Sequence, residues 1–131
     1  MIKTDKLLEI ARALKENNSE LSSFHVTFAY NKKRLLKIGI NSKKTHPRNL
    51  RYNYLDRKGR SRRHLVTIHS ELAVIIKLGL EDCSHIDFYV LRIDNNNNLN
   101  YSKPCSGCQD LFNQVGYKNI YYSTKKGFSK L

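Results

Sequence analysis

The 131-residue sequence has few acidic side chains, few cysteines and no long apolar run. Its 11 Asp and Glu stand against 24 Lys and Arg, so the formal net charge is +13. Three cysteines cannot form a closed disulfide framework, which favours a reducing, cytoplasmic setting. No run approaches the roughly 18 to 20 apolar residues of a membrane helix, and residues 1–9 lack the apolar core of a secretory signal. We therefore expect an intracellular protein with no membrane contact.

The residues that are present suffice for one folded domain. Hydrophobic residues make up 40% of the chain and aromatic residues 10%, too many for a disordered basic tail. No internal repeat and no domain boundary is visible in the sequence. We therefore expect a single domain over residues 1–131.

The positive charge is concentrated in one segment, residues 41–64. This segment carries nine Lys and Arg against one acidic residue, Asp56, which gives a local net charge of +8. Pro47 and Gly59 interrupt it and no periodicity runs through it, so we expect a long loop. Lys and Arg neutralise phosphates and tyrosine faces stack on bases, so the loop fits a nucleic-acid partner. A solvated loop that keeps the protein soluble is the alternative.

Hydrophobic periodicity predicts an alternation of helices and strands on either side of this loop. Residues 23–30 place Phe24, Val26, Phe28 and Tyr30 on one face, as in a half-buried strand. The predicted elements are helix 5–16, strand 23–30, strand 34–40, helix 70–79, strand 85–93, polar loop 94–103, helix 105–115 and strand 119–124, with at most one short strand in 125–131. This order predicts an α/β fold in which helices pack on a mixed sheet of four or five strands, with an N-terminal antiparallel hairpin.

Two short motifs carry the candidate chemistry, and each falls at the start of a predicted helix. The first is His69-Ser70-Glu71, and the second is the run Pro104 to Cys108, which reads PCSGC. One histidine and two cysteines are zinc ligands that leave a fourth tetrahedral position for water. Glu71 is placed to move protons beside that water. Cys83 is interpreted as a small buried hydrophobic residue.

These motifs make the sequence resemble the zinc-dependent cytidine and deoxycytidylate deaminase superfamily over residues 24–124. Gly39-Ile40-Asn41 and Lys44-Thr45-His46-Pro47 extend the resemblance to deoxycytidylate-type and phage-encoded members. The resemblance implies a three-layer cytidine-deaminase-like fold in which His69, Cys105 and Cys108 bind Zn²⁺. It implies that Glu71 shuttles protons while cytosine becomes uracil and ammonia leaves, and that the chain can form homo-oligomers. The Lys- and Asn-rich composition indicates an AT-rich, virus-like genome.

The substrate stays open between several classes. Nine basic residues exceed what one nucleotide phosphate needs, so the charge favours single-stranded DNA or RNA over free deoxycytidylate or another pyrimidine nucleotide. Adenosine in transfer RNA and a non-catalytic, zinc-containing nucleic-acid-binding module are further alternatives. In the deaminase family an Asn at the position of Asn41 commonly hydrogen-bonds the sugar or base. The candidate substrate-binding residues are Asn41, His46, Tyr52, Tyr54, Arg62, Arg63 and Ser106.

Overall fold

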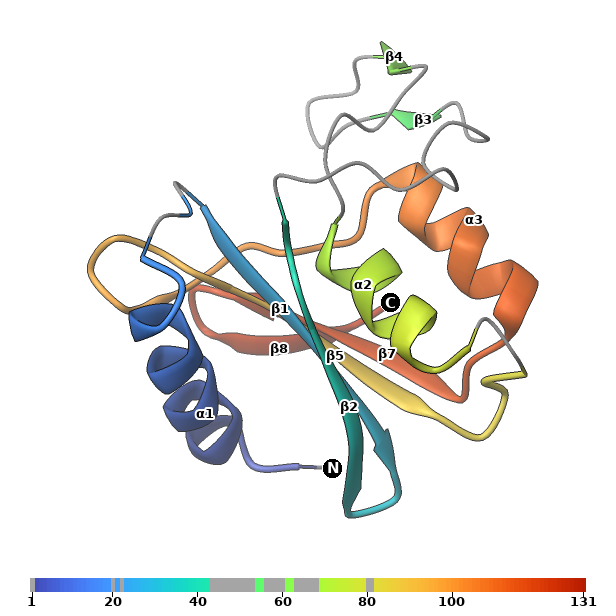
Figure 1. The fold of residues 1–131 in the computed structure, drawn as a ribbon, viewed down its shortest axis with the longest axis horizontal. Coiled ribbons are helices and arrows are strands. Elements are labelled where there is room, and N and C mark those ends of the chain that lie inside the picture. The colour runs from blue at the N-terminus through green and yellow to red at the C-terminus, as the bar shows by residue number, and fades with distance from the viewer. Residues whose placement is uncertain are drawn as a thin grey trace.

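The structure is a computed structural model that describes residues 2–19, 21, 23–42, 54–55, 61–62, 69–79 and 82–131. A mixed six-stranded sheet lies at its centre, with the strand order β2-β1-β5-β7-β8 and with β6 paired to β5 (Figure 1). The elements are α1 (Thr4–Glu16), β1 (Phe24–Asn31), β2 (Arg34–Ile40), β3 (Tyr54–Leu55), β4 (Ser61–Arg62), α2 (Ser70–Lys77), β5 (Asp87–Ile93), β6 (Leu99–Asn100), α3 (Ser106–Val115), β7 (Asn119–Thr124) and β8 (Gly127–Lys130).

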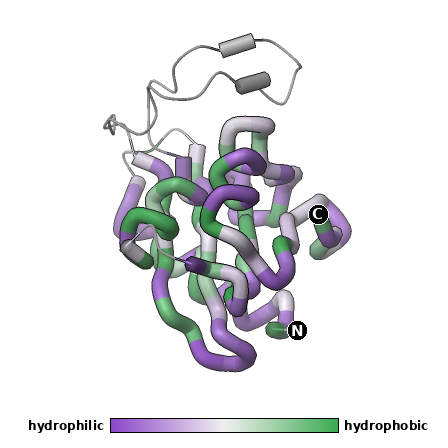
Figure 2. Tube along the Cα trace, turned by 90° about the vertical axis from the view of Figure 1, so that its right-hand side faces the viewer, coloured by the Kyte–Doolittle hydropathy of each residue, from purple (hydrophilic) through white to green (hydrophobic). Residues whose placement is uncertain are grey.

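Helices cover both faces of the sheet and give three layers (Figure 1). On β5, Tyr89 and Leu91 pack with α1 on one face, whereas Phe88 and Val90 pack with α2 and α3 on the other. The alternation follows from the two-residue period of a strand. Figure 2 shows that the hydrophilic β1–β2 turn lies at the bottom of the molecule, away from this interior. No helix in the described part of the chain is long and apolar enough to cross a membrane.

The predicted fold class is confirmed. The β1–β2 hairpin is antiparallel, β5 and β7 run parallel, and a short strand, β8, follows β7 in residues 125–131. The count of strands reaches six because of β6, where the sequence predicts only polar loop. This strand has two residues and pairs with the end of β5, so neighbouring backbone rather than local propensity selects it.

The prediction that β1 is half-buried is wrong, because both of its faces are covered. Phe24, Val26 and Phe28 share one face, as predicted, and that face packs with α1, but Thr27 and Ala29 on the other face are also fully buried. Both are small, so α2 can lie close above them. Directly opposite Thr27 in the β1–β2 pairing stands Gly39. A Cβ built on Gly39 would lie 2.6 Å from the carbonyl oxygen of Ser70 and closer still to the backbone nitrogen of Val74.

The basic segment 41–64 lies mostly outside the described residues. Within it, β3 and β4 form a separate two-stranded antiparallel sheet, which the sequence did not predict. The strand β3 lies against α3 (Figure 1). Within this segment, β3 therefore lies beside a helix that begins at one of the predicted metal-binding motifs.

Candidate metal centre

Two helix starts bring the predicted metal ligands together. His69 is the residue before the first turn of α2 and Cys105 the residue before the first turn of α3; both have extended backbone conformations. Cys108 lies in the first turn of α3. One nitrogen of His69 and the two cysteine sulfurs all lie within 4.8 Å of one another. The Nδ1 atom of His69 is 3.7 Å from the Cys105 sulfur and 3.5 Å from the Cys108 sulfur.

These separations fit a tetrahedral zinc ion. With Zn–S near 2.3 Å and Zn–N near 2.0–2.1 Å, tetrahedral angles place sulfur and nitrogen ligands about 3.6 Å apart. The two measured sulfur–nitrogen distances lie on either side of that value. Two sulfur donors and one imidazole nitrogen are also the donor types that zinc prefers. The group therefore has the composition and the spacing of three legs of a zinc site.

The pKa values of the two cysteine thiols are shifted in opposite directions. Hydrogen bonds from Cys108 and from His69 outweigh burial and lower the pKa of Cys105 to about 4. The pKa of Cys108 is raised well above its ordinary value by its bond to Cys105, by full burial and by the charge of Glu71. Two adjacent buried thiolates repel each other, so one proton is retained. A divalent cation would take the place of that proton.

Glu71 adds a carboxylate to this centre. Its side chain is 1% exposed, and both its charge and its hydrogen-bonding interaction with the Cys108 thiol raise the pKa of that thiol. The Ser70 hydroxyl donates to Glu71 Oε1 at 3.0 Å, but Oε2 is buried without a hydrogen-bond partner. An unpaired buried carboxylate oxygen costs free energy. The orphaned Oε2 therefore marks the place where a ligand of the centre would donate a hydrogen bond.

Two buried serines, Ser102 and Ser123, anchor the segment that precedes Cys105. The Ser102 hydroxyl donates to the carbonyl oxygen of Val90 on β5 at 2.7 Å and accepts from the Ser123 N–H on β7 at 2.9 Å. The Ser123 hydroxyl in turn donates to the carbonyl oxygen of Asn100 at 2.6 Å. These bonds fasten the segment after β6 between β5 and β7. They fix the approach of the chain to the start of α3.

The predicted substrate-binding residues are described to different extents. The carboxamide of Asn41 bridges the end of β2 to the start of β1: its Oδ1 accepts from the His25 N–H and its Nδ2 donates to the Ser23 carbonyl oxygen, both at 2.8 Å. Ser106, half-buried, is the first residue of α3. Tyr54 and Arg62 are paired opposite each other in the β3–β4 ladder. The remaining candidates, His46, Tyr52 and Arg63, lie outside the described residues.

Sequence reasoning missed the roles of Thr27 and Ser70, whose hydroxyl groups are linked through Ser70 to the Glu71 carboxylate. Both are fully buried, and their hydroxyl oxygens are 2.9 Å apart. The available signal was Thr27, a polar residue inside the apolar strand 23–30, together with the hydroxyl of Ser70 in the middle of the first motif. Cys83 is 1% exposed within the core, as predicted. It does not belong to the metal-ligand group found among the described residues.

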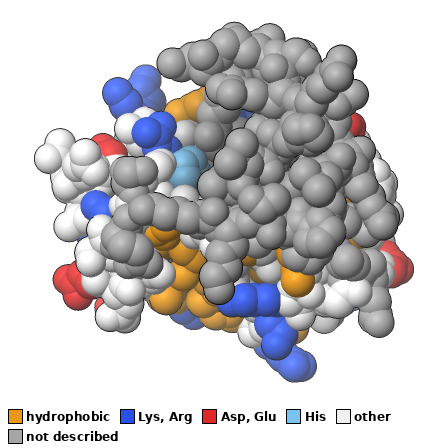
Figure 3. Space-filling model, turned by 45° about the horizontal axis from the view of Figure 1, so that its top comes forward, with side chains coloured by type: hydrophobic (Ala, Val, Ile, Leu, Met, Phe, Trp, Pro, Cys, Tyr) orange, Lys and Arg blue, Asp and Glu red, His pale blue; other side chains and the backbone are white. Residues whose placement is uncertain are grey.

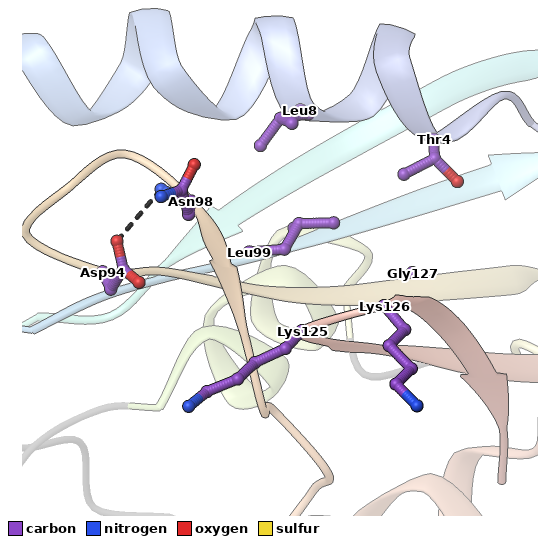
Figure 4. A pocket seen from close by; sticks show the side chains of 8 residues that line it. All are labelled: Thr4, Leu8, Asp94, Asn98, Leu99, Lys125, Lys126 and Gly127. Carbon is purple, nitrogen blue, oxygen red and sulfur yellow. Dashed lines mark hydrogen bonds between the residues drawn. The ribbon is translucent and has the colours of Figure 1, made fainter.

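A groove lies beside α1, and none of its lining residues belongs to the metal-ligand group. This groove of 530 Å³ is lined by α1, the turn after β5 and the β7–β8 turn; its residues are Thr4, Leu8, Asp94, Asn98, Leu99, Lys125, Lys126 and Gly127 (Figure 4). The ammonium groups of the two lysines point away from α1 (Figure 4). In the view onto the top of the molecule, a histidine side chain lies in a hollow beside Lys or Arg side chains (Figure 3).

The three-layer arrangement defines a class: the chain has the α/β fold of the cytidine deaminases. The crystal structure of cytidine deaminase from Mycobacterium leprae is similar to it, with a TM-score of 0.54 and 20% sequence identity. The similarity covers 99% of this chain and 94% of that chain. The sequence matches no protein-family model and no curated protein. At this identity the similarity establishes the fold, and the chemistry has to be argued from the residues of the centre.

Proposed function

We propose that the protein is a zinc-dependent hydrolytic deaminase that converts cytosine to uracil and releases ammonia. The observation that carries the proposal is the orphaned Oε2 of Glu71 beside three ligand atoms with zinc-like spacing. A purely structural zinc site has no use for a buried carboxylate of this kind. The likeness in fold to a cytidine deaminase supports the same reaction class.

The residues of the centre divide the reaction between them. His69, Cys105 and Cys108 would hold zinc, and zinc when bound supplies a Lewis acid that lowers the pKa of water towards roughly 7. Glu71 takes a proton from the attacking water and passes it to the ring nitrogen. The same carboxylate then takes the second proton of that water, now on the hydroxyl of the attacked ring carbon, and passes it to the departing amino group as the bond from carbon to nitrogen breaks. Water and cytosine become uracil and ammonia, so atoms and charge balance.

Single-stranded nucleic acid is the proposed substrate class. The +8 charge of residues 41–64 supports it, as does the position of β3 against α3. Tyr54 and Arg62, which are opposite each other in the β3–β4 pairing, offer one stacking and one phosphate-binding residue. The base must leave its stack to reach the centre, which favours an unpaired strand.

Free deoxycytidylate is the second candidate. It is favoured by the resemblance of Gly39-Ile40-Asn41 and Lys44-Thr45-His46-Pro47 to deoxycytidylate-type deaminases. A homo-oligomer in the cytoplasm of the cell, or of a virus-infected host, completes the proposal. A reducing compartment would keep Cys105 and Cys108 available as ligands.

A product assay on the zinc-loaded protein tests the proposal. Deoxycytidylate, cytidine, single-stranded DNA, single-stranded RNA and transfer RNA are offered side by side, and uracil, inosine and ammonia are measured. We expect about one zinc per chain and uracil formation that is fastest on a single strand. The matched control is Glu71→Gln, which should keep the metal and lose turnover. Oligonucleotide binding without any turnover would instead support a non-catalytic module, and inosine would support adenosine as the substrate.

Salt dependence separates the two leading substrates. Affinity for a single-stranded oligonucleotide should fall with salt, with a slope of about −0.7 in log–log form for each phosphate contact. Deoxycytidylate carries one phosphate group, so its affinity should change much less. If the protein deaminates deoxycytidylate and not the oligonucleotide, the nucleic-acid proposal is overturned.

A further inference from the structure

We propose that Thr27 and Ser70 are positioning residues that hold the Glu71 carboxylate in one orientation, with Oε2 turned to the metal centre. The inference rests on the proposed function, in which Glu71 moves the protons. It assigns a role to two hydroxyl groups that bind neither metal nor substrate.

The three side chains form a chain of hydrogen bonds inside the protein. Thr27 and Ser70 are fully buried and Glu71 is 1% exposed. The Thr27 and Ser70 hydroxyl oxygens are 2.9 Å apart, and the Ser70 hydroxyl is 3.0 Å from Glu71 Oε1. Both hydrogen bonds are direct, so no bridging water is needed, and all three groups are shielded from solvent.

Counting protons fixes the direction of the chain. A hydroxyl has one proton to donate, and an ionised carboxylate has none. Ser70 donates its proton to Glu71 Oε1, so the bond between Ser70 and Thr27 must be donated by Thr27. The order is therefore Thr27 to Ser70 to Oε1. Each donation strengthens the next, since hydrogen bonds in series polarise one another.

The backbone of the hairpin makes this chain of contacts possible. Thr27 on β1 and Gly39 on β2 are paired across the hairpin. Because Gly39 has no side chain, the backbone of Ser70 and Val74 lies directly over it. The close approach of α2 brings the Ser70 hydroxyl down to Thr27. Any larger residue at position 39 would lift the helix and lengthen this bond.

This series of hydrogen bonds makes the two oxygens of the Glu71 carboxylate different from each other. A carboxylate can exchange its oxygens by rotating about its last bond, and that torsion is broad. The bond from Ser70 holds Oε1 against the sheet, which leaves Oε2 as the oxygen without a partner. The oxygen that moves protons thus starts in its working position. A loosely held carboxylate would reach that position for only part of the time.

The test compares Ser70→Ala and Thr27→Val with the zinc-loaded wild-type protein. Turnover (kcat) should fall about 10- to 100-fold in Ser70→Ala, the loss that a misplaced catalytic group produces. KM and zinc content should change little, because neither hydroxyl contacts substrate or metal. Thr27→Val keeps the shape of the side chain and leaves the hydrogen bond from Ser70 to Glu71 Oε1 in place. Its loss of turnover should therefore be smaller than that of Ser70→Ala. Thr27→Ser should restore the wild-type value. Ser129→Ala, on β8, is the matched control and should leave turnover unchanged.

Infrared spectroscopy provides a readout that does not depend on activity. The difference spectrum between each protein and its own Glu71→Gln counterpart isolates the carboxylate bands of Glu71. The bands should shift in Ser70→Ala, shift less in Thr27→Val and stay in place in Ser129→Ala. Unshifted bands in Ser70→Ala would overturn the proposal even if no substrate had been found. If the wild-type protein has no turnover but the bands still shift in Ser70→Ala, the proposed function is overturned and the positioning role is not. If Ser70→Ala fails to fold, unshifted bands and unchanged kcat in Thr27→Val would overturn the positioning role.

Discussion

The two faces of the central sheet bury different kinds of side chain. Under α1 the face is apolar and aromatic, with Leu7, Phe28 and Tyr89 packed together. Under α2 and α3, polar side chains are buried between the sheet and the helices. They are Thr27 on β1 and Ser70 and Glu71 on α2. On the α1 face, the Tyr89 hydroxyl accepts the Ile2 N–H, and burial raises its pKa. One face is arranged for stability, while the other keeps polar groups that are costly to bury.

The difference locates the chemistry. A buried unsatisfied polar atom costs about 1–3 kcal/mol, so it persists where another requirement holds it. Glu71 Oε2 is such an atom, and it lies on the face where both metal-binding motifs begin their helices. The hydroxyl of Tyr30 is also buried without a partner, on the α1 face. Tyr30 packs among apolar and aromatic side chains of that face, whereas the group of His69, Cys105 and Cys108 lies at the starts of α2 and α3.

Removing a metal ligand should cause the largest loss of turnover among these variants. Its consequences should be limited to the α2–α3 face of the sheet. In Cys108→Ser the zinc content should fall well below one per chain, and turnover should drop more than about 100-fold. Loss of a group that only supports a metal ligand already costs 10–100-fold. The matched control is Cys83→Ala, which removes another buried cysteine outside the ligand group. Full zinc content and turnover in Cys108→Ser would exclude that residue from the centre.

Gly39→Ala should have the next largest effect on turnover. The added methyl group would meet the backbone of Ser70 and Val74, so α2 must shift and carry Glu71 with it. We expect a loss of about 1–3 kcal/mol in the free energy of unfolding, as for an overpacked core, together with reduced turnover per folded molecule. Urea unfolding and an assay on the folded fraction measure the two effects. Lys37→Ala, exposed on the same strand, is the control, and a Gly39→Ala protein with wild-type properties would contradict the close contact.

Leu7→Ala should separate stability from function. Leu7 is fully buried in the core of the α1 face. Its truncation should lower the free energy of unfolding by about 2–5 kcal/mol through lost burial and a cavity. Turnover per folded molecule and zinc content should stay at the wild-type level, because the α1 face takes no part in the centre. A turnover loss as large as that of Gly39→Ala would show that the two faces are coupled.

The fold could be predicted from sequence wherever the local pattern and the final environment agree. Strands 34–40 and 119–124 have their predicted bounds, and helix 5–16 begins only one residue earlier than predicted. The strand expected at 85–93 begins at Asp87, because residues 83–86 form a turn closed by the Ile86 N–H on the Cys83 carbonyl oxygen. The errors on β1 and β6 share one cause. In both, a neighbouring element decided what local polarity and propensity alone could not.

The candidate site was predictable in its ligands and not in its supports. His69, Cys105 and Cys108 lie in recognisable motifs, and the structure brings them together. The supports come from distant parts of the chain: Thr27 from β1, Gly39 from β2, Ser102 from the segment after β6, and Ser123 from β7. Their roles depend on three-dimensional contacts that no spacing in the sequence records. The role of residues 41–64 stays a prediction, since most of them lie outside the described residues.

The smallest expected effect concerns the turn that borders the groove beside α1. The Asp94 carboxylate accepts the N–H groups of Asn98 and Asn96, and these bonds together with the nearby charges of Lys15 and Arg92 lower its pKa. Because the folded pKa lies below the unfolded one, the stabilisation is present above the unfolded pKa and is lost as pH falls through the folded pKa. Asp94→Asn should therefore lower the free energy of unfolding slightly at neutral pH, because the carboxylate is exposed and screened.

The same substitution should make no difference in acid, once the wild-type carboxyl group is also neutral. Urea unfolding of both proteins at neutral pH and below the lowered pKa measures this. The turn is held independently by α1, since Lys15 donates to the Asp94 carbonyl oxygen and Arg12 to that of Asn97, both at 2.7 Å. Zinc content and turnover should be unchanged at either pH. A change in turnover would mean that the α1 face reaches the metal centre through this turn, and the contrast between the two faces would fail there.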